Sequence, residues 1–146
     1  MNPSQSPQEY FRLLLLTVVG QAFGAAGYEL DERPVQWAGG QFRFAKMLDS
    51  GQRAVIEFQL LAYTDTEYAA RNPSRFRVTL SRGNGLHRTL SALVVEDFGV
   101  AILPSADHWW TFADTETLGR ALAEAGHLIV GYGLPWLAGE LTPPLG

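Results

Sequence analysis

The sequence predicts an α+β fold in which an N-terminal and a C-terminal helix pack on one face of an antiparallel β-sheet of about four to five strands. Apolar and polar residues alternate through residues 53–63 and 75–82, with the period of two that is typical of strands. Segments with helical character precede and follow these strands. Because the 146 residues match the usual length of one domain, we expect 1–146 to be a single domain, with residues 1–6 a disordered tail.

The first helix is expected from about Pro7 to Ala26, ending at Gly27. Ser6 can cap it, and Pro7 and Glu9 are both favourable in a first turn. Apolar residues lie almost all round this helix, which predicts that it is buried on most sides.

The apolar stretch Leu13–Val19 within this helix has the length of a signal-peptide core. The segment before it contains Glu9 and a single basic residue, Arg12, which makes a poor positive leader. Glycines interrupt the region too often for a membrane span of about 20 apolar residues. We therefore expect a soluble, cytoplasmic protein without a membrane segment.

Three strands are expected after this helix, at 41–47, 53–63 and 75–82, and turns are expected at 49–51 and 83–85. Residues 64–74 would form a loop. The side chains predicted to face the core are Phe42, Phe44, Ala54, Ile56, Phe58, Leu60, Ala62, Phe76, Val78 and Leu80.

The segment 86–103 is ambiguous, because its apolar residues fit both helical spacing and short strands. Residues 104–108 would form a loop, and 110–112 an edge strand. A second helix is then expected, capped by Asp114 or Thr115. Gly131 and Gly133 would end it, and Pro135 would prevent a restart. Its apolar stripe comprises Leu118, Ala121, Leu122, Ala125 and Ile129.

The C-terminal third contains a Trp-Trp-x-Phe motif at 109–112 and a Gly-Leu-Pro-Trp-Leu motif at 133–137. With the helix between them, these motifs look like a bacterial family of domains of unknown function, over most of a chain of this length. The resemblance implies a helix–sheet–helix layout and a stand-alone bacterial domain. It implies no activity, because the shared residues are of packing types.

The composition excludes several kinds of chemistry. The sequence has no cysteine, which removes disulfides, cysteine nucleophiles and thiolate metal sites. Its three histidines are far apart, and it has neither a phosphate-binding glycine motif nor a serine nucleophile motif. We expect no catalytic residue, no metal site and no cofactor.

Charge is distributed unevenly along the chain. Residues 33–88 hold nine of the eleven basic residues, whereas residues 89–146 hold one basic and seven acidic residues. On the strands, four arginines are expected on the sheet face opposite the core: Arg43, Arg53, Arg75 and Arg77. Guanidinium groups suit carboxylates and phosphates, so this face is a candidate binding site.

The preferred hypothesis is a non-enzymatic binding or interaction module that holds an acidic protein partner on this basic face, of which an immunity protein is one example. The predicted aromatic residues face inward, which argues against a nucleic-acid platform. Two alternatives stay open. In the first, the arginines only keep the sheet soluble and pair with acidic residues of the C-terminal half. In the second, the chain forms a homodimer.

A second hypothesis places a pocket between the first helix and the sheet, near Asp107, His108 and Trp109. A carboxylate, an imidazole and aromatic rings come together there, which would suit a small-molecule-binding protein or a hydrolase. The structural alternative is a turn before an edge strand whose tryptophans fill the core.

Overall fold

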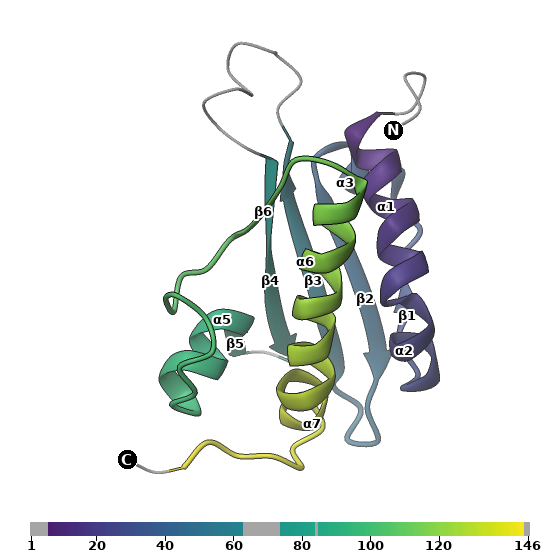
Figure 1. Ribbon diagram of the computed structural model, residues 1–146. Coiled ribbons are helices and arrows are strands. Elements are labelled where there is room, and N and C mark those ends of the chain that lie inside the picture. Colours follow the sequence, from purple (N-terminus) through teal and green to yellow (C-terminus); the bar gives the residue numbers. More distant parts are fainter. Residues whose placement is uncertain (1–5, 63–73, 84, 145–146) are drawn as a thin grey trace.

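The computed structural model describes residues 6–62, 74–83 and 85–144. It has the predicted α+β fold, with helices on one face of an antiparallel sheet (Figure 1). Helices α1 (Pro7–Val18) and α6 (Thr115–Leu128) lie side by side in front of the strands in this view. Within the described ranges, no helix has both the length and the hydropathy that crossing a membrane requires.

The sheet is built around three long strands in the order of the sequence, β2 (Gln41–Met47), β3 (Arg53–Leu61) and β4 (Ser74–Arg82). The short strand β1 (Glu29–Leu30), which the pattern did not predict, pairs with β2. Two further strands pair with the edge of β4 that faces away from β3. Strand β5 (Leu86–Thr89) pairs with the C-terminal half of β4, and β6 (Trp110–Phe112) pairs with its first residues. All pairings are antiparallel.

The core lies between this sheet and the helices. The inward side chains of the three long strands are buried as predicted, and the four strand phenylalanines are at most 2% exposed. Phe11 of α1 is fully buried and lies at the centre of their ring cluster, with ring centroids 5.2 Å from Phe42 and 5.5 Å from Phe76. Ala62, which was predicted in the same strand, lies one residue past the end of β3 and is only partly buried.

The continuous first helix predicted for 7–26 is interrupted at Val19. Helix α1 ends at Val18, and a second helix, α2 (Gly20–Ala25), follows at once. Val19 stays in the right-handed region with a ψ of -15°, but its φ of -115° departs from the usual helical value of about -63°. Thr17 donates its hydroxyl hydrogen to the carbonyl oxygen of Leu13. A side-chain hydrogen bond to a carbonyl group of the preceding turn often bends a helix. Gly20, which follows Val19, is a residue type at which helices bend easily.

The ambiguous segment 86–103 contains both kinds of structure. After β5, a helical turn α5 (Leu90–Ala92) continues into the π-helical turn η1 (Leu93–Asp97). Thr89 caps this helix, since its hydroxyl oxygen accepts a hydrogen bond from the Ala92 amide.

A short helix α3 (Pro34–Ala38), which was not predicted, precedes β2. The loop predicted for 64–74 lies outside the described residues, except that Ser74 begins β4.

The predicted end of the second helix is wrong. Asp114 caps α6 as expected, and the predicted apolar stripe is buried. However, the chain continues through the π-helical turn η2 (Ile129–Gly133) into helix α7 (Leu134–Leu137). Pro135 lies in the first turn of α7, where its missing N–H group needs no partner. Gly133 keeps helical angles, and a Cβ atom there would lie 3.1 Å from the Leu80 side chain.

Candidate functional site

The second face of the sheet, which we call the outer face, points away from α1 and α6 (Figure 1). It carries the side chains that alternate with the buried core residues of β2, β3 and β4. The register pairs Arg43 with Glu57, Arg53 with Met47, and Arg77 with Gln59. All four arginines predicted for this face therefore lie on it.

At one end of the outer face, Trp109 lies against two of these arginines. The guanidinium carbon of Arg75 is 4.9 Å from the centre of the Trp109 ring, and that of Arg77 is 4.8 Å from it. Trp109 precedes β6, which pairs with β4 so that Thr111 is opposite Arg75. We call Arg75, Arg77 and Trp109 the Trp109 clamp.

Neither arginine of the Trp109 clamp has a carboxylate partner in the described part of the chain. Arg77 donates from Nε to the amide oxygen Oε1 of Gln59, at 2.9 Å. The Nε atom of Arg75 is buried and has no hydrogen-bond partner there. A guanidinium group has five N–H donors, and the described residues leave the terminal N–H groups of both arginines without a carboxylate beside the indole ring.

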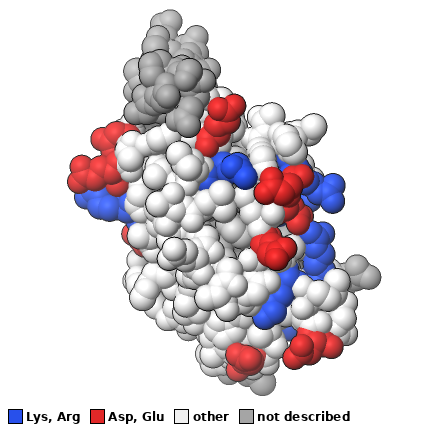
Figure 2. Space-filling view, turned by 90° about the vertical axis from the view of Figure 1, so that its right-hand side faces the viewer, with Lys and Arg blue, Asp and Glu red and all other residues white. Residues whose placement is uncertain are grey.

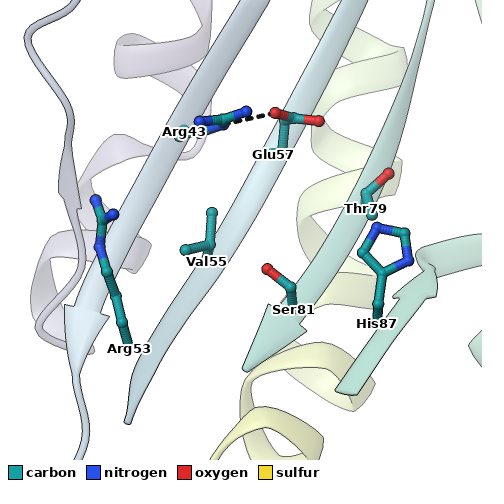
Figure 3. Close-up of a pocket in the computed structure, with 7 residues that line it drawn as sticks. All are labelled: Arg43, Arg53, Val55, Glu57, Thr79, Ser81 and His87. Carbon is teal, nitrogen blue, oxygen red and sulfur yellow. Dashed lines mark hydrogen bonds and ion pairs between the residues drawn. The ribbon is translucent and has the colours of Figure 1, made fainter. Parts of the chain in front are cut away.

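The centre of the outer face is hollowed into a depression of about 240 Å³. Its floor is made by short side chains of neighbouring strands, Val55, Thr79 and Ser81, and longer side chains rise around them (Figure 3). Those longer side chains are Arg43, Arg53, Glu57 and His87. We call this feature the central depression.

The two arginines beside the central depression are already paired. Nε of Arg43 is 2.6 Å from Oε1 of Glu57, and a terminal nitrogen of Arg53 is 2.6 Å from Oδ2 of Asp31. Figure 2 views the right-hand side of Figure 1, with the outer face edge-on, and shows acidic and basic side chains interleaved on that side of the molecule. Counting the described residues, the Trp109 clamp is therefore the less neutralised part of the outer face.

The three residues of the second predicted site do not converge. Trp109 lies on the outer face, whereas the ring of His108 contacts the ring of Trp110 edge-on, with centroids 4.7 Å apart. Asp107 is exposed. Trp110 is 4% exposed and stacks on Phe76 at 5.5 Å, so it fills the core as one alternative predicted. That alternative also placed Trp109 in the core, and this part of it is wrong.

His108 is expected to make the stability of the fold depend on pH. Burial lowers the pKa of His108 below its ordinary value of 6.5, and the nearby carboxylate of Glu124 opposes this shift. As the pH falls through about 6.5, His108 binds a proton in the unfolded chain before it does so in the folded chain. The free energy of unfolding therefore decreases as the pH falls from the pKa of the unfolded chain to the lower pKa of the folded chain. We expect the guanidinium concentration at the midpoint of unfolding to decrease when the pH is lowered from about 7.5 to about 5.5. The decrease should be smaller in His108→Gln.

The matched control for this prediction is His127→Gln. His127 is exposed on α6, and its replacement is the comparison for the loss of a histidine as such. Equal pH dependence in the wild type and in His108→Gln would contradict the assignment to His108.

The sequence did not predict that Trp109 lies on the outer face beside the arginines. Alternation along β6 was a signal for it, because Trp110 and Phe112 contact core rings and residue 109 must then point the opposite way. The pairing of β6 with the first residues of β4, which brings the indole to Arg75 and Arg77, has no signal in the sequence.

Among the residues described, no three histidine, aspartate or glutamate side chains gather in a way that could hold a metal ion. Comparison of the chain with protein-family models, with curated proteins and with solved structures found no match.

Proposed function

We propose that the chain is a non-enzymatic interaction module that holds an acidic segment of a partner protein on the outer face of its sheet. The observation that carries the proposal is the Trp109 clamp, in which two arginines that have no carboxylate partner among the described residues lie against one indole ring, on the sheet face opposite α1 and α6. An immunity-type role, in which the chain masks its partner, belongs to this class and agrees with the resemblance to a stand-alone bacterial domain.

The composition of the Trp109 clamp favours a protein partner. Tryptophan and arginine are enriched among the few residues that contribute most of the binding energy at protein interfaces. The indole supplies a rigid apolar surface, and the guanidinium groups supply charge-assisted hydrogen bonds to carboxylates. Both arginines project from β4, whose pairing on both sides holds them in place.

Charge favours a partner that differs from this chain. In a two-fold symmetric dimer whose axis passes through the Trp109 clamp, the arginines of one copy would meet those of the other, and like charges repel. Nucleic acid is disfavoured by the net charge of -4 and by the burial of Phe42, Phe44, Phe58 and Phe76, which leaves the outer face without a series of stacking aromatics from β2, β3 and β4.

The test is capture from a lysate of the source cells, followed by identification of the captured protein and calorimetry with that protein purified. The double variant Arg75→Gln, Arg77→Gln should weaken binding by about 2 kcal/mol or more, roughly thirtyfold, because it removes the charged groups at the centre of the interface. Binding should also weaken as salt is added.

The matched control is Arg120→Gln. Arg120 is exposed on α6, in the helical layer on the opposite side of the sheet, and its loss changes the charge of the chain in the same direction. Its affinity should equal that of the wild type. Unchanged affinity in the double variant, or capture that is lost on nuclease treatment, would show that the outer face does not bind an acidic protein.

A further inference from the structure

We infer that Ser91 is a positioning residue for the proposed binding site, because its hydroxyl group holds the backbone on the N-terminal side of Trp109. Ser91 lies on α5 and is 3% exposed, so it cannot itself contact a partner. It acts through Trp109, whose indole ring forms the Trp109 clamp with Arg75 and Arg77. The inference rests on the proposed function and names what keeps that site in its binding geometry.

The Ser91 hydroxyl group joins α5 to the segment that precedes β6. It donates its hydrogen to the carbonyl oxygen of Ala106 at 2.8 Å, and its oxygen accepts a hydrogen bond from the backbone N–H of His108 at 3.1 Å. The one hydroxyl therefore serves as donor and as acceptor to the backbone of this segment. Because a polar group that is buried without a partner costs free energy, these two bonds resist separation of the segment from α5.

The other side of Trp109 is held by the sheet. Strand β6 begins at Trp110, so Trp109 itself lies just outside it. Pairing of β6 with β4 places Trp110 opposite Phe76, and the two rings stack with centroids 5.5 Å apart. With the tie that Ser91 supplies, the backbone is held both before and after Trp109.

These two ties set the direction of the Trp109 side chain. The rings of His108 and Trp110 contact each other, with centroids 4.7 Å apart, so the residues on either side of Trp109 lie together. The Trp109 ring instead contacts Arg75 and Arg77 on the outer face. A site that is ordered before binding loses less conformational entropy when its partner binds, so the tie at Ser91 should raise affinity.

Helix α5 gives the Ser91 hydroxyl group a fixed position. Leu90 before it and Leu93 after it are both fully buried in the core. Thr89 caps the helix, because its hydroxyl oxygen accepts a hydrogen bond from the Ala92 amide at 3.2 Å. The Ser91 hydroxyl therefore connects a part of the chain that is anchored in the core to the backbone beside the Trp109 clamp.

The variant Ser91→Ala tests the inference, because it removes the hydroxyl and leaves two backbone groups without this partner. In ¹⁵N-labelled protein, the heteronuclear NOE of the Trp109 indole N–H should decrease, and the signal is identified by its loss in Trp109→Phe. The NOE of the Trp136 indole, which is 7% exposed on α7, should stay as in the wild type. Affinity for the purified partner should fall about threefold to tenfold, because the indole must then be ordered during binding.

Two control variants separate positioning from a general loss of stability. Ser105→Ala removes a hydroxyl that accepts a hydrogen bond from the Asp107 amide within the same segment and does not tie it to α5. Ile56→Val shortens a fully buried side chain of β3 and so lowers stability elsewhere in the core. Both should keep the wild-type NOE of Trp109 and the wild-type affinity. If Ser91→Ala does not fold, Ser91→Cys offers a weaker hydrogen-bonding group of similar size and should show an intermediate loss.

An unchanged NOE of Trp109 in Ser91→Ala would overturn the inference, as would an equal decrease in Ile56→Val or wild-type affinity in spite of a decreased NOE. The proposed function fails separately, if the double variant Arg75→Gln, Arg77→Gln binds the partner as the wild type does. If that double variant loses binding while Ser91→Ala keeps it, the inference alone is wrong.

Discussion

Replacing Phe11 by alanine is expected to lower the free energy of unfolding by about 3–5 kcal/mol, the range for a buried phenylalanine. Phe11 is fully buried, and its ring contacts those of Phe42, Phe58, Phe76 and Phe112. The variant leaves a cavity between α1 and all three long strands, which close packing prevents from collapsing. Guanidinium denaturation followed by circular dichroism measures the loss.

The matched control lies on the same helix. Leu13 is half exposed, and Leu13→Ala should change the free energy of unfolding by less than about 0.5 kcal/mol. If Phe11→Ala does not fold, Phe11→Leu keeps part of the ring volume and should show an intermediate loss. Equal stability of the Phe11 and Leu13 variants would contradict the arrangement of the core.

Replacing Gly40 by alanine is expected to cost about 3 kcal/mol or more, from a left-handed backbone and a backbone collision together. Gly40 has a φ of +84°, and a Cβ atom there would lie 2.3 Å from the carbonyl oxygen of Leu60. The Leu60 amide also donates to the carbonyl oxygen of Gly40, at 2.7 Å, so neither backbone segment can move without losing this bond. Thermal unfolding would report the loss as a lower midpoint.

The neighbouring glycine is the control for this prediction. Gly39 has a φ of -87°, and the nearest atom to a Cβ placed there is 3.5 Å away, which is ordinary contact. Gly39→Ala should be neutral or should stabilise the chain by up to about 1 kcal/mol, because alanine restricts the unfolded state. Similar losses at both positions would contradict the described turn before β2.

The strands and the two main helices were predictable because their signals are local. Alternation in 53–63 and 75–82 fixes which side chains face the core, and every strand phenylalanine expected there is buried. The cap at Asp114 and the stripe of α6 follow from side chains within one element. Local rules failed at Pro135, because a proline that ends one helix can equally occupy the first turn of the next.

The candidate site divides in the same way. Strand alternation was enough to place Arg43, Arg53, Arg75 and Arg77 on one face. It could not tell which of them would be paired, since the partners of Arg43 and Arg53 come from other strands and loops. Nor could it bring Trp109 to the face, and the sequence instead suggested a pocket with His108.

The sequence by itself determined the class of fold, the faces of the long strands and the absence of cysteine chemistry, because these depend on composition and on periodicities of two and 3.6 residues. Only the tertiary structure decided that β6 pairs with β4, that two arginines lie against Trp109 without a carboxylate partner in the described residues, and that short side chains hollow the centre of the outer face. These features depend on which strands become neighbours, and strand pairing brings together residues far apart in the chain, for which local patterns carry no signal.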